Sequence, residues 1–109
     1  MNSKFPSDVK LSIGLPVFNG EKFLQKCLDS LLEQTFENFE IIISDNASTD
    51  TTQNICQKYS EKDKRIRYIR QEKNIGLLPN FNFVLEQSNN KFFMWIGVDV
   101  GITLYRFLD

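Results

Sequence analysis

The sequence contains no histidine, and this absence removes several chemistries at once. Histidine-based catalytic triads, histidine metal ligands and histidine general acid–base catalysis are all excluded. Cysteine is scarce as well, since Cys27 and Cys56 are the two in the chain. Both fall on the predicted inner faces of helices, so we expect two reduced, buried thiols rather than a disulfide or a metal site.

An excess of charge of one sign is also missing. Thirteen Lys and Arg residues against fourteen Asp and Glu residues give a net charge of −1. This balance lacks the basic excess by which proteins bind nucleic acids or anionic membranes, so we expect no nucleic-acid partner. No apolar run approaches the roughly 20 residues that span a bilayer. We therefore expect a cytoplasmic protein, or one held peripherally at the inner face of the membrane.

The chain does contain enough apolar material for a core, because 41% of its 109 residues are hydrophobic and ten are phenylalanine. This length corresponds to one domain or to part of one. The strongest pattern is EIIISDNASTD over residues 40–50, in which three isoleucines stand together without alternation. Such a run is typical of a strand covered on both faces, as in a parallel sheet. It ends in Ser44, Asp45 and Asn46, and Asp50 is predicted to cap the helix that follows.

Strand-like and helix-like patterns alternate along the chain, which favours an α/β fold with a parallel sheet and right-handed crossovers. Residues 1–8 are polar and are predicted to be a flexible leader, and residues 101–109 form an atypical tail without a clear apolar period. The predicted strands cover residues 10–15, 41–43, 66–70 and 92–98, and the predicted helices cover residues 21–34, 51–60 and 79–87.

The first predicted helix is amphipathic, and Asn19 is placed to cap it. Its predicted apolar stripe consists of Phe23, Cys27, Leu28, Leu31 and Leu32. In open α/β sheets, ligands bind beyond the carboxyl ends of the strands. Asp45 and Asn46 follow one predicted strand, and Asp99 follows another, so we expect these three residues to share that edge of the sheet.

Four stretches carry a further pattern. The first is PVFN at 16–19, followed by FL at 23–24 and LDSLLEQT at 28–35. The others are FEIIISDNASTD at 39–50, NIG at 74–76 with Asn80, and FFMWIGVD at 92–99. Together, over residues 10–100, they resemble the nucleotide-sugar-binding part of family 2 glycosyltransferases, which are inverting enzymes with the GT-A fold. The resemblance implies a three-layer, Rossmann-like α/β domain over residues 9–100, with a mostly parallel sheet.

The resemblance also implies transfer of a sugar from UDP or dTDP to an acceptor hydroxyl, as in polysaccharide or cell-surface glycan biosynthesis. A pyrimidine base needs an acceptor for its N3–H, and the resemblance gives that task to Asp45 and Asn46. Asn46 stands where the family often has a second acid, so it keeps a carbonyl acceptor and removes a charge. The remaining donor-binding residues that the resemblance implies are Pro16, Phe18, Asn19, Asn80 and Asp99.

The residues themselves leave other interpretations open. Phe18 fits equally well as a core aromatic beneath the first helix. Asp45 could be a loop carboxylate that caps the next helix, and Asn80 a residue at the start of a helix that bonds locally.

In the family, the strand ending near residue 98 carries a pair or triplet of acids that holds Mg²⁺ or Mn²⁺ against the pyrophosphate. Here Asp99 is the acid present, and Val98 and Val100 flank it. The resemblance therefore implies Asp99 as the metal ligand in a weak site. Nothing after Asp99 resembles the half that supplies the acceptor site and the catalytic carboxylate. We expect a truncated or frame-disrupted member whose open apolar surface favours self-association.

A second hypothesis is a non-catalytic module that binds a nucleotide, another partner or nothing, and the two valines beside Asp99 favour it. A dinucleotide-binding Rossmann domain matches poorly, because residues 16–21 contain a single glycine and no GxGxxG motif. A phosphoacceptor receiver domain would require acids after the first strand, and PVFN has none.

Overall fold

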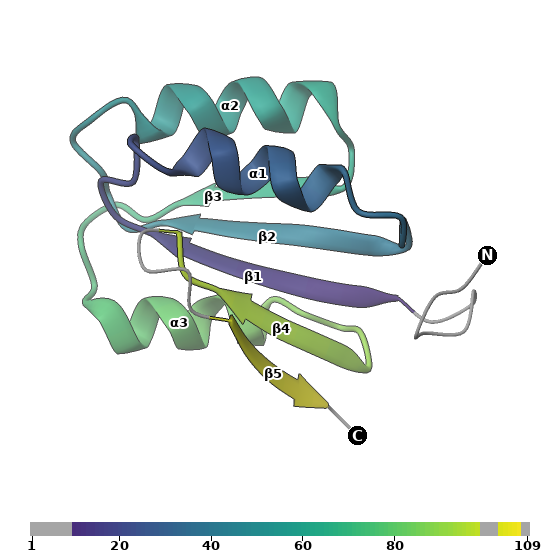
Figure 1. The fold of residues 1–109 in the computed structure, drawn as a ribbon. Coiled ribbons are helices and arrows are strands. Elements are labelled where there is room, and N and C mark those ends of the chain that lie inside the picture. The colour runs from purple at the N-terminus through teal and green to yellow at the C-terminus, as the bar shows by residue number, and fades with distance from the viewer. Residues whose placement is uncertain (1–9, 99–102, 108–109) are drawn as a thin grey trace.

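The computed structural model describes residues 10–98 and, by their backbone, residues 103–107. Over these residues five strands form one sheet in the order β3-β2-β1-β4-β5, with helices on both faces (Figure 1). The elements are β1 Leu11–Val17, α1 Leu24–Leu32, β2 Phe39–Asp45, α2 Thr52–Lys62, β3 Ile66–Arg70, α3 Leu77–Glu86, β4 Phe92–Ile96 and β5 Thr103–Phe107.

The four strands β1 to β4 run parallel, and β5 pairs antiparallel with β4. The register places Asp45, the last residue of β2, opposite Val17 of β1 and Arg70 of β3. Three neighbouring strands therefore end level with one another at the same edge. The predicted three-layer α/β fold with a mostly parallel sheet is confirmed, whereas the sequence does not predict β5.

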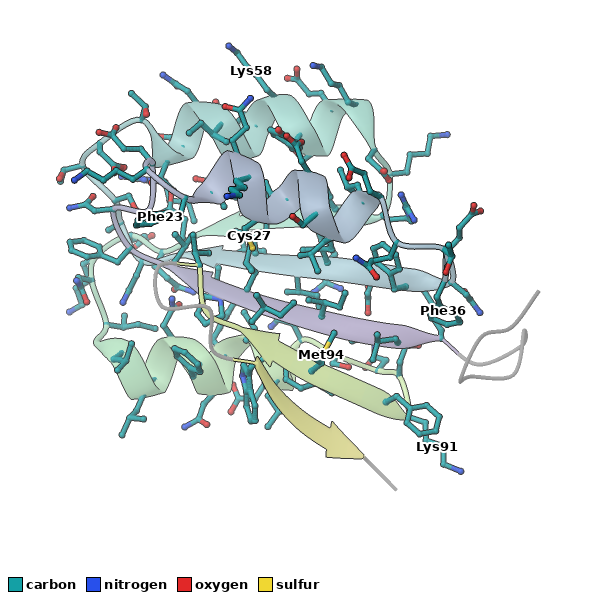
Figure 2. All side chains as sticks on the ribbon, in the orientation of Figure 1. Phe23, Cys27, Phe36, Lys58, Lys91 and Met94 are labelled. Carbon is teal, nitrogen blue, oxygen red and sulfur yellow. The ribbon has the colours of Figure 1, made fainter. Side chains whose placement is uncertain are left out.

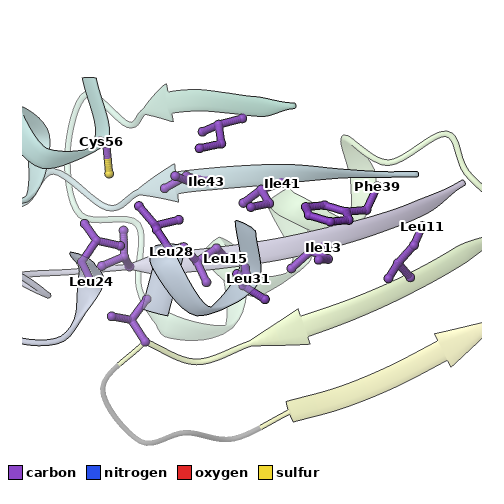
Figure 3. Close-up of a cluster of buried hydrophobic side chains, with 13 residues drawn as sticks. Leu11, Ile13, Leu15, Leu24, Leu28, Leu31, Phe39, Ile41, Ile43 and Cys56 are labelled. Carbon is purple, nitrogen blue, oxygen red and sulfur yellow. The ribbon is translucent and has the colours of Figure 1, made fainter. Parts of the chain in front are cut away.

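The isoleucine run of β2 is buried on both faces of the sheet, as predicted. Ile41 and Ile43 belong to the larger apolar cluster, under α1 and α2, and Ile42 belongs to a smaller one under α3. Figure 1 shows α1 and α2 on one side of the sheet and α3 on the other. The buried members of the larger cluster (Figure 3) are Leu11, Ile13, Leu15, Val17, Leu24, Leu28, Leu31, Phe39, Ile41, Ile43, Cys56, Ile66 and Val98.

Gly14 allows α3 to lie close to the centre of the sheet. A Cβ at this position would come within 2.5 Å of Phe93 Cζ and 2.7 Å of Val84 Cγ2. Contacts this short do not occur between real side chains, so the position requires a residue without a Cβ. Val84 of α3 packs directly against Gly14 of β1, and this contact sets how closely α3 lies to β1.

The structure extends the first strand beyond its predicted end. β1 includes Pro16 and Val17, although Pro16 lacks an amide hydrogen for the sheet. β4 pairs with β1 only as far as Gly14, so Pro16 lies beyond the last pair on that side. A proline at such a position costs the sheet no ladder hydrogen bond.

The predicted cap of the first helix is wrong. α1 begins at Leu24, and its N-cap residue is Phe23, which makes no side-chain cap hydrogen bond. Residues 21–23 form a turn in which the carbonyl of Gly20 accepts hydrogen bonds from the amides of Phe23 and Leu24. Because the helix starts later than predicted, Leu24 is buried in the core and Phe23 is exposed.

Cys27 and Cys56 are both free thiols. Burial raises the pKa of Cys27, and burial together with the nearby charges of Asp45 and Asp50 raises the pKa of Cys56 to about 12. Both thiols are therefore held in the neutral form; Cys56 is buried, as predicted, whereas Cys27 is half-buried. Among the described residues, no helix has the length and apolar character needed to cross a bilayer.

Candidate functional site

The candidate site lies at the edge where the parallel strands end. We define the rim as three loops: residues 18–21 after β1, residues 46–51 after β2 and residues 71–76 after β3. All three lie at the end of the molecule to which these strands point in Figure 1. Figure 2 places Phe23 at this end, and Phe36 and Lys91 at the opposite end.

Asp45 is the most deeply buried charged group of the rim region, with an exposed fraction of 0%. Its Oδ1 accepts a hydrogen bond from the Ser48 amide at 2.9 Å. Its Oδ2 accepts from the Tyr68 hydroxyl at 2.6 Å and from Arg70 Nη1 at 3.1 Å. Arg70 Nη2 also donates to the Ser48 carbonyl at 3.0 Å. The carboxylate therefore ties the loop after β2 to two residues of β3.

The surroundings of Asp45 also affect Tyr68. Burial raises the pKa of the Tyr68 hydroxyl, and its hydrogen bond to Asp45 raises it further. The hydroxyl thus stays protonated and serves as a donor to the carboxylate. Sequence reasoning missed both Tyr68 and Arg70, although their spacing of two residues in a strand predicts that they share a face.

Asn46 is buried to an exposed fraction of 3%, and its side-chain amide is fixed in one orientation. Its Oδ1 accepts from the Ile75 amide at 2.8 Å. Its Nδ2 donates to Asn74 Oδ1 at 3.0 Å and to the Gly76 carbonyl at 3.1 Å. Because a backbone amide can only donate and a backbone carbonyl can only accept, these partners identify the oxygen and the nitrogen without ambiguity. Asn46 thus holds the loop after β3 against the loop after β2.

Asn80 is buried as well, and its side chain joins α3 to β2. Its Oδ1 accepts from Ser44 Oγ at 2.6 Å, and its Nδ2 donates to the Ser44 carbonyl at 3.0 Å. Gln71 Nε2 donates to the same Ser44 hydroxyl at 3.1 Å. These bonds span 36 residues of sequence between Ser44 and Asn80, so they are not the local contacts of a helix start.

The predicted site residues of the first loop differ in exposure. Pro16 is buried, whereas Phe18 and Asn19 are exposed, and the exposed fraction of Phe18 is 47%. Phe18 is therefore not the core aromatic that the sequence left open. Asn19 has a φ of 50°, in the left-handed region that asparagine tolerates better than most residues. Its Oδ1 accepts from the Thr49 amide at 2.8 Å.

Asp50 lies in the rim loop after β2, and its carboxylate accepts hydrogen bonds from backbone amides on both sides of the rim. Its Oδ1 accepts from the Thr52 amide, the first of α2, at 2.9 Å. The N-cap residue of α2 is Thr51, so Asp50 lies one residue ahead of the cap position that was predicted for it. Burial acts to raise the pKa of Asp50, but hydrogen bonds from Thr52 and from the Glu21 amide outweigh it and lower the pKa.

The metal ligand implied by the resemblance, Asp99, lies outside the described residues. Val98, which precedes it, is buried and lies near Gly20, since a Cβ on Gly20 would come within 3.3 Å of Val98 Cγ1. In the part of the chain that the structure describes, no group of three or more His, Cys, Asp and Glu residues could hold a metal ion. The structure thus brings Asp45, Asn46 and the other described site residues to one edge, and the place of Asp99 beside them stays a prediction.

Comparison with known proteins gives a consistent picture. A family model described as glycosyl transferase family 2 matches residues 12–103. Glycosyltransferase GlyA from Streptococcus pneumoniae serotype 4 is 40% identical over 105 residues, which cover 91% of this chain and 15% of that protein. A Campylobacter jejuni protein named GalNAc(5)-diNAcBac-PP-undecaprenol beta-1,3-glucosyltransferase is 35% identical over 91 residues, which cover 83% of this chain and 29% of its own length.

Solved structures agree with these sequence relatives. The crystal structure of S. aureus TarS 1-349 in complex with UDP-GlcNAc has a TM-score of 0.76 and 32% identity, and the match covers 84% of this chain and 27% of that one. The mannosyltransferase PcManGT from Pyrobaculum calidifontis, in complex with GDP-Man and Mn²⁺, has a TM-score of 0.76 at 20% identity and shares the fold. This chain spans less than a third of the length of each of these four proteins.

Proposed function

Because this chain belongs to glycosyl transferase family 2, we propose that its rim binds the nucleoside diphosphate of a UDP-sugar or dTDP-sugar, as the donor step of inverting transfer to an acceptor hydroxyl. TarS, whose structures contain UDP and UDP-GlcNAc, supports this choice of donor. The proposal concerns donor binding, because the chain spans 15% of GlyA and less than a third of TarS.

The orientation of the Asn46 amide is the observation that carries the proposal. Both hydrogens of its Nδ2 are used inside the chain, by Asn74 and Gly76. Its Oδ1 accepts one bond, from Ile75, and a carbonyl oxygen has a second lone pair. The amide can therefore offer a ligand an acceptor but no donor. Uracil and thymine present an N3–H, whereas the N3 of cytosine is itself an acceptor, so Asn46 matches the first two bases.

The other site residues divide into contacts and supports. The exposed ring of Phe18 is available to lie against the base or the ribose. Asp45 and Asn80 are buried, and their side chains bind β3, the loop after β2 and Ser44, so that they connect separate elements beneath the rim. We assign these two residues to holding the rim in place, and Pro16 to the buried end of β1 beneath it.

Mg²⁺ or Mn²⁺ would neutralise the charge on the diphosphate of such a donor. The described residues contain no cluster of acids that fits this ion. Asp99 remains the ligand implied by the family resemblance, and PcManGT was crystallised with Mn²⁺.

Calorimetric titration of the chain with UDP and with CDP tests the proposal, because the two nucleotides share ribose and diphosphate and differ at the edge of the base. We expect UDP to bind at least about tenfold more tightly than CDP, since CDP would place two acceptors against each other. Replacing Asn46 by Ala should remove the preference, and replacing Asn54, which is exposed on α2, should leave it unchanged. Equal affinities for the two nucleotides in the wild-type chain would contradict the proposal that Asn46 accepts a hydrogen bond from the base. The titrations are repeated with Mn²⁺.

A second candidate is a module that binds no nucleotide at this site. Over the described residues, no buried side-chain nitrogen or oxygen lacks a hydrogen-bond partner, so the rim is complete without a ligand. The absence of binding heat for UDP, dTDP and GDP, with and without Mn²⁺, would favour this candidate over the first.

A further inference from the structure

Two loops of the rim are joined by hydrogen bonds that cross between them. Residues 19–21 follow β1, residues 48–51 follow β2, and Thr52 begins α2; we call residues 19–21 together with residues 48–52 the clasp. Seven hydrogen bonds of 2.8 to 3.4 Å connect the two loops, across 29 to 32 residues of sequence. Side chains of each loop bind backbone amides of the other, so neither loop is held mainly by itself.

Two side chains of the first loop accept hydrogen bonds from amides and hydroxyls of the second loop. Asn19 Oδ1 accepts from the Thr49 amide at 2.8 Å and from the Thr49 hydroxyl at 3.4 Å. Glu21 Oε1 accepts from the Thr51 amide at 3.0 Å and from the Thr51 hydroxyl at 2.8 Å. Asn19 and Glu21 thus satisfy amides that stand just ahead of α2.

Side chains of the second segment also accept hydrogen bonds from backbone amides of the first loop. The N-cap residues of α1 and α2 make no side-chain cap hydrogen bonds of their own. Amides ahead of a helix need partners, and here each loop supplies them for the other. The returning bonds run from the Asn19 amide to Ser48 Oγ at 2.8 Å, from the Gly20 amide to Thr52 Oγ1 at 2.9 Å and from the Glu21 amide to Asp50 Oδ2 at 3.2 Å.

The clasp fixes the backbone on the far side of Phe18. On the near side, the Val17 carbonyl accepts a hydrogen bond from the Asn46 amide at 2.8 Å. Phe18 therefore stands between two fixed points, one of which includes the left-handed Asn19. We propose that Asn19 and Glu21 are positioning residues, which hold the Phe18 ring where it meets the base of the nucleotide. This inference rests on the function proposed above, and it gives Asn19 a different role from the direct donor contact implied by the resemblance.

Four of the seven hydrogen bonds of the clasp can be removed without unfolding the chain. The four bonds accepted by Asn19 and Glu21 are exposed to solvent, and such bonds contribute little to global stability. α1 is anchored separately, by the burial of Leu24 and Leu28 in the core. Loss of these bonds should therefore loosen the loop locally and leave the helix in place.

Asn19→Gly is the most informative replacement, because glycine keeps the left-handed backbone while removing the side-chain oxygen. We expect UDP affinity, measured by calorimetry, to fall about five- to tenfold and the Thr49 amide to exchange its hydrogen faster. Asn19→Asp keeps an acceptor oxygen and should recover most of the affinity, at a salt concentration that screens Glu21 and Asp50. Tyr59→Phe is the matched control, because it removes a hydrogen bond of 2.6 Å between α2 and Asp29 of α1 away from the rim.

A double-mutant cycle tests whether Asn19 acts through Phe18. Phe18→Ala alone should weaken UDP binding by about tenfold or more, since it removes a ring that stacks on the base. If Asn19 only positions Phe18, the double variant should bind no more weakly than Phe18→Ala alone, because the second change has nothing left to position.

Three results would overturn the proposal. Additive losses in the double variant would mean that Asn19 contacts the nucleotide independently of Phe18. Unchanged UDP affinity in Asn19→Gly, together with faster exchange at Thr49, would mean that the position of the loop does not matter. A wild-type chain that binds no UDP would refute the proposed function and the positioning role with it. This result differs from the first two, which are observed only if the wild-type chain binds UDP.

Discussion

The buried carboxylate of Asp45 offers the sharpest test of how the rim is held. Asp45→Asn preserves shape and volume but removes the charge and turns one acceptor oxygen into a donor group. The three groups that now donate to Asp45 come from Ser48, Tyr68 and Arg70. An asparagine cannot accept from all of them in either orientation, so at least one donor loses its partner.

The magnitude follows from which bond is lost. The bond to Arg70 is charge-assisted, and such bonds contribute about 1.5–3 kcal/mol. Arg70 has a side-chain exposure of 33%, so water repays part of the loss, while the unpaired amide or hydroxyl adds to it. We expect the free energy of unfolding to fall by about 2–3 kcal/mol. With an m value of about 1.5 kcal/mol/M, the urea midpoint should fall by about 1.3–2 M.

Asp63→Asn is the matched control for this experiment, because Asp63 forms an ion pair of 2.9 Å with Arg65 at side-chain exposures of 24% and 29%. Water reaches both side chains of this pair, and such pairs contribute about 0–1 kcal/mol, so the control should lose about 1 kcal/mol, which is less than Asp45→Asn should lose. Urea unfolding at neutral pH, followed by circular dichroism and by Trp95 fluorescence, measures both. Equal losses in the two variants would refute the reasoning, since burial would then not distinguish the two carboxylates.

Three further predictions concern the core, a thiol and the pH dependence. Gly14→Ala should lower the free energy of unfolding by about 1–3 kcal/mol in urea titrations, because the new Cβ would lie 2.5 Å from Phe93 Cζ; a neutral effect would mean that α3 can move away. Cys56 should not react with a disulfide reagent at about pH 8 until urea unfolds the chain, because it is buried and its pKa is raised to about 12; rapid modification of the folded chain would contradict this. The hydrogen bond from Arg65 lowers the pKa of Asp63, so the stability that the Asp63 carboxylate contributes is complete above its unfolded pKa of about 3.9 and is lost as the pH falls through the lower folded value. The wild-type chain should therefore lose more stability than Asp63→Asn on acidification below about pH 4. Parallel curves of unfolding free energy against pH for the two chains would contradict the assignment.

The sequence predicted those features that depend on neighbouring residues. The isoleucine run predicted a strand buried on both faces, and residues 66–70 were predicted as a strand with the bounds that β3 has. Asp50 lies just ahead of α2 and accepts from the Thr52 amide. Each of these follows from a period or a cap within a few residues.

The sequence could not predict features that depend on residues far along the chain. Asn19 has the side chain of a helix cap, but that side chain binds Thr49, which is 30 residues away. Asp45 was placed correctly at the end of its strand, while its partners on β3 became visible only with the register of the sheet. The fold also reveals why Gly14 must be glycine, since its neighbours Val84 and Phe93 come from α3 and β4.

The clasp has a consequence for recombining this chain with its relatives. A chimera whose crossover falls between residues 22 and 47 would take residues 19–21 from one parent and residues 48–52 from the other. Its two loops would then have to match across seven hydrogen bonds that were selected in different backgrounds. A crossover after residue 52 inherits both loops from a single parent, so libraries built with that junction should retain more members in which the clasp forms.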